Sequence, residues 1–207
     1  MIRQIGRAGD DELWGGFDAD FITGGDGNDD LWGGSSPIRP ATFTLATTHN
    51  GISGGALATS SSSDGGILAP GDTGNDRLIG GDGDDSLHGQ GGNDRLIGGD
   101  GRDGFVFDTP LDPNTNVDDV RDFVPRNGDG DRIVLSRGIF TDIGIKLSKG
   151  EFHIGKKAED GNDHIIYNSK SGGLFFDNDG RGGDSAILFA MLDAKLKPTN
   201  NDFEMIA

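Results

Sequence analysis

The sequence contains no cysteine, little apolar material and few positive charges. The absence of cysteine excludes a disulfide framework. If the protein works outside the cell, a bound metal must therefore stabilise the fold in place of disulfides. Only 32% of the 207 residues are hydrophobic, which is below the share usual in globular domains. The chain has 18 Lys and Arg residues but 35 Asp and Glu residues. The resulting net charge of −17 argues against binding of nucleic acid or an anionic membrane through the average electrostatic field of the protein.

Long hydrophobic runs are missing as well. The N-terminus, residues 1–4, has no apolar signal region, and no segment is long enough to span a membrane. We therefore expect that any export is directed by another part of the chain. Low apolar content with high like charge is typical of disorder, unless a cation neutralises the carboxylates and lets a thin core close.

Glycine, in contrast, is abundant at 38 residues, and it is regularly spaced. A nine-residue pattern, G-G-x-G-x-D-x-U-x with U apolar, is clearest at residues 24–32, 80–88 and 98–106. Followed in register, the pattern gives seven units, with Asp at position 6 and an apolar residue at position 8 in all of them. The predicted inward residues are Leu13, Ile22, Leu31, Leu78, Leu87, Leu96 and Phe105.

The fourth unit is interrupted, and the sequence allows two interpretations. Gly33-Gly34-Ser35 opens the unit, the pattern breaks at Ser36 and it returns at residues 74–79. In one interpretation residues 36–73 are an insertion looped out of a single split unit. In the other, residues 71–79 have a turn of their own and Gly33 lies in the loop. The insertion itself is either a small hairpin or a mobile loop, and the sequence does not decide.

Each unit predicts a turn over its first six residues and a short strand over its last three. Glycines at positions 1, 2 and 4 permit positive φ and let backbone carbonyls converge. The Asp at position 6 adds a carboxylate, and calcium prefers about six to eight such oxygen ligands. Successive strands on opposite sides predict an all-β fold, in which two parallel sheets enclose a thin apolar seam and units 18 residues apart stack.

This pattern resembles the RTX, or hemolysin-type, calcium-binding repeats of type I secreted bacterial proteins, which form a right-handed parallel β-roll. The resemblance implies several calcium ions, each between the turns of units n and n+2. The first turn would give the carbonyls of positions 2 and 4 and its Asp, and the second the carbonyls of positions 1 and 3 and its Asp. The implied carboxylate pairs are Asp11–Asp29, Asp29–Asp85 and Asp85–Asp103 on one edge, and Asp20–Asp76 and Asp76–Asp94 on the other.

The clearest site would use the carbonyls of Gly81, Gly83, Gly98 and Asp100, and an Asp of the following segment would complete the final site. The candidate calcium ligands are Gly9, Asp11, Gly16, Asp18, Asp20, Gly24, Gly25, Asp26, Gly27, Asp29, Gly33, Ser35, Gly74, Asp76, Gly80, Gly81, Asp82, Gly83, Asp85, Gly89, Gly91, Gly92, Asp94, Gly98, Gly99, Asp100, Gly101, Asp103, Asp118 and Asp122. Departures from the pattern at Arg7, Asp18 and Gln90 weaken the first, second and sixth units.

The outward position 9 carries Trp14 and Trp32, followed by His88 and Val106. Two interpretations apply to these aromatic residues: a strip that binds a partner, or a stacked pair covered by neighbouring chain. The second is the simpler and is favoured.

Beyond Val106 the repeat stops, and residues 107–207 predict a region of short strands that caps the array. Residues 168–173 are predicted as the loop of a hairpin. Residues 118–123, 131–136, 164–169 and 173–180 resemble the region that follows the repeats in serralysin-type proteases. This resemblance implies an uncleaved export signal at the extreme C-terminus, read by an ABC transporter, and residues 204–207 fit it.

No catalytic motif is evident. The four histidines are scattered, and neither H-E-x-x-H nor G-x-S-x-G occurs. Residues 127–131 and 177–180 lack the EF-hand glycine and glutamate, so they are interpreted as turns. We therefore expect a monomeric, extracellular, calcium-binding module rather than an enzyme. This module is expected to fold when it binds calcium after type I export. The alternative is the C-terminal part of a secreted protease, lipase, epimerase or adhesin whose active domain is absent from this chain.

Overall fold

The computed structural model describes the chain except for residues 2, 16–18, 34–73, 127–129 and 181–184. Nearly all regular structure in the described residues is β-strand, and their one helical element is a short 3-10 turn, η1 (Asn200–Asp202). No helix in these residues could cross a membrane. The expected all-β class is confirmed.

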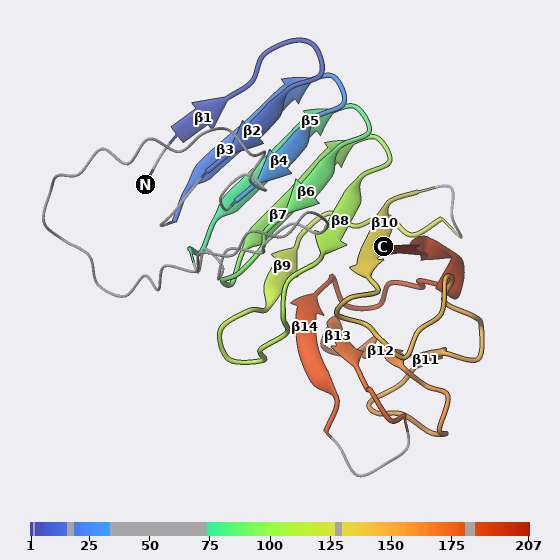
Figure 1. The fold of residues 1–207 in the computed structure, drawn as a ribbon. Helices are drawn as coiled ribbons and strands as arrows, with labels where there is room; N and C mark the ends of the chain where they lie inside the picture. The colour runs from blue at the N-terminus through green and yellow to red at the C-terminus, as the bar shows by residue number, and fades with distance from the viewer. Residues whose placement is uncertain (2, 16–18, 34–73, 127–129, 181–184) are drawn as a thin grey trace, which may run out of the picture.

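Two sheets face one another along the repeat, and successive strands alternate between them (Figure 1). Sheet A begins with β1 (Arg3–Ile5), β3 (Phe21–Asp26), β5 (Arg77–Asp82), β7 (Arg95–Asp100) and β9 (Asp118–Val120). Sheet B contains β2 (Glu12–Trp14), β4 (Asp30–Trp32), β6 (Ser86–His88), β8 (Gly104–Phe107), β10 (Arg132–Ser136) and β15 (Phe203–Ile206). Every pairing among these strands is parallel, so the expected parallel β-roll is confirmed.

The register passes across the insertion without a shift. Phe21 on β3 pairs with Arg77 on β5, and Asp30 on β4 pairs with Ser86 on β6. The Gly33 N–H donates to the His88 carbonyl at 2.9 Å, as the Gly15 N–H does to the Trp32 carbonyl at 2.8 Å. Gly33 is therefore position 1 of the unit that contains Asp76, and the chain has the split unit. Residues 36–73, for which a hairpin or a loop was predicted, lie outside the described residues.

The core of the roll is one apolar side chain thick. Burial alternates along β3, β4, β5 and β6, so that on β5 Leu78 is fully buried while Arg77 and Ile79 face outward. The position-8 residues of the other described strands are also fully buried, except Leu13 in the first unit, which is partly buried. Each such side chain contributes about 1.5–3 kcal/mol to folding, which is a modest total for a chain of this size. The turns must therefore supply much of the specificity and stability.

The strands of sheet A are longer than predicted. β3, β5 and β7 each cover six residues and continue into the following turn, where Gly25 pairs with Gly81 and Asp26 with Asp82. The reason is a close backbone approach, since a Cβ on Gly81 would fall on the carbonyl oxygen of Gly25. Only glycine permits this contact, and it lets the sheet hydrogen bonds run on, as from the Gly27 N–H to the Asp82 carbonyl at 2.7 Å.

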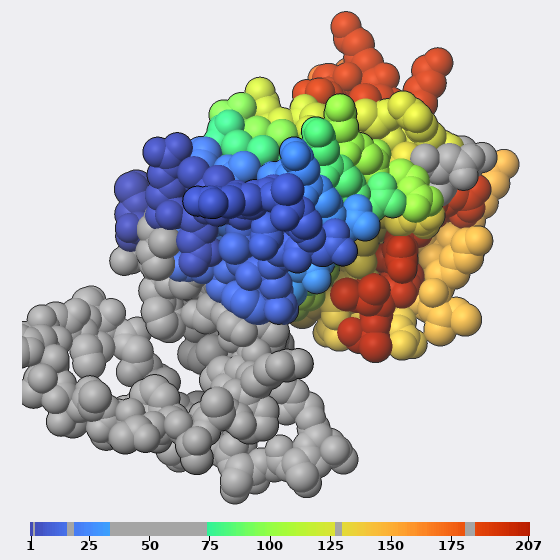
Figure 2. Space-filling model, turned by 90° about the horizontal axis from the view of Figure 1, so that it is seen from above, coloured from blue at the N-terminus to red at the C-terminus, as the bar shows by residue number. Residues whose placement is uncertain are grey.

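The C-terminal segment extends both sheets beyond the repeat. Sheet A continues from β9 to β14 (Ile187–Met191), β13 (Gly173–Phe176), β12 (Ile165–Tyr167) and β11 (Phe152–Ile154). β12 and β13 are antiparallel, which confirms the predicted hairpin. Phe107, Phe140 and Phe189 pack edge to face in a conventional core at this end. Figure 2 shows the chain progressing from blue to yellow along the roll, with the C-terminal segment beyond it. A domain boundary at residue 106 stays a prediction.

The outward aromatic residues form a stack on sheet B. The Trp14 and Trp32 rings lie 5.1 Å apart at an interplanar angle of 12°, and Trp32 and His88 lie 4.9 Å apart at 24°. The stacking expected in the second interpretation is present and includes His88 as a third ring, whereas its cover by neighbouring chain stays a prediction.

The position-2 residues give a testable contrast. Gly81→Ala should destabilise the calcium-loaded protein by about 2–4 kcal/mol, because φ is +130° there and the added Cβ meets the Gly25 carbonyl. Gln90, at the same position of the sixth unit, has a φ of 70°, so Gln90→Gly should stabilise by about 1 kcal/mol. Urea unfolding in calcium measures both. Equal effects of the two substitutions would contradict this account of the turns.

Candidate metal centre

The position-6 aspartates form two ladders along the edges of the roll. In each step a backbone N–H of one turn donates to a carboxylate oxygen, Oδ1, of the next turn on the same edge. On the first edge the donors and acceptors are Asp11 to Asp29 at 2.8 Å, Asp29 to Asp85 at 2.6 Å and Asp85 to Asp103 at 3.0 Å. On the second edge they are Asp20 to Asp76 at 2.5 Å and Asp76 to Asp94 at 2.7 Å. All five predicted carboxylate pairs are thus neighbours.

The other carboxylate oxygen, Oδ2, has no hydrogen-bond partner in the described structure for Asp29, Asp85, Asp94 and Asp103. These residues are at most 3% exposed. Each Oδ2 lies against the position-1 glycine of its own unit, where a Cβ would collide with it, as at Gly80 beside Asp85. A buried charged group without a partner costs more than about 1–3 kcal/mol, so these oxygens require a cation or a proton.

Backbone carbonyls converge on the same gap between turns. The Gly81 and Gly83 carbonyls lie against Gly99 and Gly101 of the next turn, and the Gly98 carbonyl lies against Gly80. The fourth predicted carbonyl, that of Asp100, accepts a hydrogen bond from the Gly83 N–H at 2.8 Å, which uses one of its two lone pairs. The gap therefore holds carbonyl and carboxylate oxygens from both turns.

The carboxylates resist ionisation where no cation is bound. Burial raises the pKa of Asp85 from 3.8 to about 6 and that of Asp103 to about 7, and neighbouring carboxylates add to both shifts. Burial also raises the pKa of Asp94 and Asp118, and at Asp94 the Asp118 carboxylate adds to the rise. The shift at Asp85 corresponds to about 3 kcal/mol in favour of the protonated form. A cation in the gap would remove this penalty.

The donor set fits calcium. It contains only oxygen, which calcium prefers, and neither sulfur nor imidazole. No group of three or more His, Cys, Asp or Glu side chains suited to a metal occurs in the described residues. That result is consistent with sites that use two carboxylates and otherwise backbone carbonyls. Asp85 and Asp103, with the Gly81, Gly83 and Gly98 carbonyls, would hold the ion of the clearest site.

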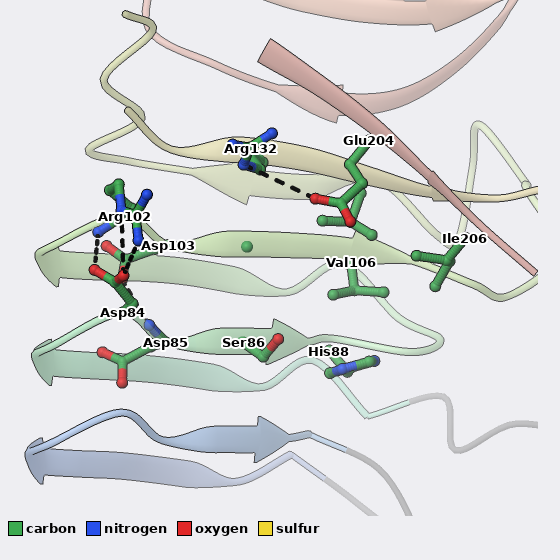
Figure 3. Close-up of a pocket in the computed structure, with 12 residues that line it drawn as sticks. Asp84, Asp85, Ser86, His88, Arg102, Asp103, Val106, Arg132, Glu204 and Ile206 are labelled. Carbon is green, nitrogen blue, oxygen red and sulfur yellow. Dashed lines mark hydrogen bonds and ion pairs between the residues drawn. The ribbon is translucent and has the colours of Figure 1, made fainter. Parts of the chain in front are cut away.

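A second ladder was missed from the sequence. Each position-5 side chain accepts from the position-5 N–H group of the following turn on the same edge: Asp10 from Asn28 at 3.0 Å, Asn28 from Asp84 at 2.8 Å, and Asn75 from Asn93 at 2.7 Å. Asp84 accepts from the Arg102 N–H at 2.9 Å and pairs with its guanidinium at 2.7 Å (Figure 3). The recurrence of Asp or Asn at position 5 in five of seven units was the available signal.

Other predicted ligands occupy different places. Gly16, Asp18 and Ser35 lie outside the described residues. The side chains of Asp26, Asp82 and Asp100 are exposed, so only their backbone faces the turns. In the first unit, Asp11 Oδ2 accepts from the Arg7 N–H at 3.0 Å, and this unit already departs from the pattern at Arg7.

The ends of the ladders differ from the prediction, which placed Asp118 or Asp122 after the seventh unit. Asp118 instead follows Asp94 on the second edge, where its Oδ1 accepts from the Asp94 N–H at 3.1 Å, because β9 pairs with β7. Asp131 follows Asp103 on the first edge at 3.1 Å, because β10 pairs with β8. Asp122 accepts from the Gly98 and Gly99 N–H groups at 2.9 Å.

Asp131 was missed because residues 127–131 were interpreted as a turn. Its signal is local: Asp131-Arg132-Ile133 repeats the polar-polar-aliphatic order of Asp76-Arg77-Leu78 and Asp94-Arg95-Leu96 without the preceding glycine pattern.

A parallel roll whose stacked Gly- and Asp-rich turns present unpartnered carboxylate oxygens defines the class of a calcium-binding β-roll. Comparison with family models agrees: residues 5–36 and 70–105 match the RTX calcium-binding nonapeptide repeat in four copies. The chain therefore contains an RTX calcium-binding repeat module, interrupted between the matched segments by the insertion. A comparison with curated proteins found no match.

The raised pKa values predict opposite pH dependences with and without calcium. Between pH about 4 and about 7 the metal-free roll binds more protons than the unfolded chain, so its stability is full below pH about 4 and falls as pH rises through the folded pKa values. In calcium, protons compete with the ion, so affinity falls as pH drops through the same range. Circular dichroism at pH about 4.5, 6 and 7.5, in EDTA and in calcium, measures both. Metal-free β-structure that increases with pH would contradict the prediction.

Asp131→Asn tests the end of the first ladder. We expect calcium affinity at the last site of that edge to fall about tenfold, or about 1.4 kcal/mol, because Asp131 supplies the carboxylate beside Asp103. Calorimetric titration of the full chain measures it. Asp142→Asn, which removes an exposed carboxylate that accepts a hydrogen bond from Thr141, is the matched control. Equal affinities for the two variants would remove Asp131 from the site.

Proposed function

We propose that the protein is an extracellular, non-catalytic calcium-binding module that folds on binding calcium after export by a type I pathway. The observation that carries the proposal is the set of buried carboxylate oxygens without partners at Asp29, Asp85, Asp94 and Asp103. Bound calcium would supply positive charge and oxygen coordination between the turns. Without it, the two aspartate ladders bring like charges together, and the chain's net charge of −17 opposes compaction.

The magnitudes support a folding switch. Extracellular calcium sites have dissociation constants of about 10⁻⁴–10⁻³ M. At calcium on the order of 10⁻³ M, a site with a constant of about 10⁻⁴ M stabilises the folded state by about 1.4 kcal/mol. The five predicted carboxylate pairs would together give about 7 kcal/mol, which is comparable to the stability of a whole domain. Calcium in the cytosol is too scarce to give this stabilisation, so the chain would pass the transporter unfolded.

The C-terminus supports the same order of events. The predicted export signal, residues 204–207, overlaps β15, which pairs in parallel with β10 at the edge of sheet B. Phe203 at its start is 4% exposed. In the folded protein this segment is tied to the sheet, so a transporter would read it before the roll closes. The similarity of the C-terminal region to serralysin-type proteases fits this proposal.

One described cavity combines a hydroxyl with an imidazole. This groove of about 360 Å³ on sheet B contains Ser86 and His88 (Figure 3). The His88 ring is oriented by Asp108, with Nδ1 to Oδ2 at 3.2 Å. Within the described structure Ser86 donates no hydrogen bond to His88, and we propose no catalytic role for this groove. We also propose that the module is monomeric.

The test is a calcium titration of the EDTA-stripped full chain, followed by far-UV circular dichroism. We expect a cooperative coil-to-β transition at about 10⁻⁴–10⁻³ M calcium and none with magnesium, which demands a smaller octahedral site. Asp85→Asn, which weakens a carboxylate shared by two gaps, should shift the midpoint to higher calcium, whereas Asp142→Asn should not. A fully folded spectrum in EDTA would overturn the folding switch.

A further inference from the structure

The outer face of sheet A carries a row of basic and aromatic side chains across neighbouring strands. Arg3 on β1 pairs in register with Phe21 on β3, Phe21 with Arg77 on β5, and Arg77 with Arg95 on β7. These four residues, here called the arginine row, are position-7 residues or their equivalent, and all face away from the core. Strand spacing of about 4.8 Å places the row over about 14 Å.

The arginines of this row have no carboxylate partner in the described part of the chain, although acidic residues outnumber basic ones 35 to 18. Arg3 and Arg77 instead flank the Phe21 ring, at 5.6 and 5.8 Å from its centroid. Elsewhere arginines do pair, as Arg121 does with Asp119 at 3.2 Å directly beyond the row. The row therefore presents cationic groups that form no ion pair with the carboxylates of the described residues.

A second row runs beside the first. Two residues further along the same strands lie Ile5, Thr23, Ile79 and Ile97, which also face outward. Ile5 is 57% exposed, and the described structure leaves the other three partly exposed. The face thus combines a line of positive charge with a parallel apolar line about 7 Å away.

We propose that this face binds a linear anionic glycan that runs across the strands. A sugar ring has an apolar face for the aliphatic row, and a glycan with one acidic group per ring repeats its charge close to the strand spacing. Alternate side chains of an extended peptide are about 7 Å apart, which fits the row less well. Carboxylated and sulfated glycans share this chemistry.

Calcium should control binding at this surface, and this part of the inference rests on the proposed function. Asp76 and Asp94 directly precede Arg77 and Arg95 in the sequence. A calcium ion bound between these two aspartates would therefore neutralise two negative charges beside the arginine row. A polyanion repelled by the metal-free chain can then approach the row. Binding is therefore expected in calcium and lost in EDTA.

The experiment titrates the full chain with tetragalacturonate and, in a second arm, a heparin tetrasaccharide, by calorimetry in calcium at several salt concentrations. The preferred glycan identifies carboxylate or sulfate as the ligand. With three guanidinium groups in contact, a plot of the logarithm of the binding constant against the logarithm of the salt concentration should have a slope of about −2, by analogy with single-stranded polyanions. Arg77→Gln/Arg95→Gln should weaken binding at least tenfold. Lys146→Gln/Lys149→Gln, an equal change of charge at exposed sites, should change it less than twofold.

Three outcomes would overturn the proposal: absence of binding to both glycans, equal weakening by both double variants, or tighter binding of tetraglutamate. The last result would reassign the face to an acidic peptide. Circular dichroism of each variant in calcium checks that the roll is intact. Because the same spectra report calcium-induced folding, glycan binding without a calcium transition would refute the folding switch and leave the arginine row standing.

Discussion

The structure depends on one arrangement: buried carboxylates stacked on one another at a spacing of 18 residues. In five of these aspartates one oxygen accepts the backbone N–H of the preceding turn on the same edge, which fixes the register of both sheets: Asp29, Asp76, Asp85, Asp94 and Asp103. At Asp29, Asp85, Asp94 and Asp103 the other oxygen has no hydrogen-bond donor in the described structure. The same ladder that orders the fold therefore also brings buried negative charges together. A divalent cation between the turns would neutralise these charges, which the thin apolar core cannot do.

Glycine is required by this stacking more than by turn formation alone. The Gly27 and Gly83 carbonyls each lie where a side chain of the next turn would stand, so successive turns approach at backbone contact. That closeness gathers carbonyl oxygens into the gap and brings like charges together. The hydrophobic interior along β4 and β6 is one residue per strand, because the strand part of each unit covers three residues whose side chains alternate. Composition, turn geometry and metal dependence are therefore consequences of the same contact.

Period explains what the sequence could predict. Leu31, Leu78 and Leu87 repeat at a fixed offset from an aspartate, so their burial and the carboxylate pairs could be predicted from spacing alone. The ends could not. Asp118 and Asp131 lack the glycine turn, and their edges are set by which strand, β7 or β8, pairs with the next one along the chain. The split unit was undecidable for a related reason, since Gly33 and Gly71 both fit position 1 and only the pairing of β3 with β5 distinguishes them.

The unbroken register across residues 36–73 has an evolutionary consequence. The segment enters between positions 3 and 4 of one turn, and β3 and β5 pair as closely as strands separated by a single unit. The entropic free-energy cost of closing a loop grows by only about 0.6 kcal/mol for each doubling of the loop's length. A lineage could therefore gain, exchange or lose a whole appended element at this turn in one genetic event. The ladder on either side would not have to be rebuilt.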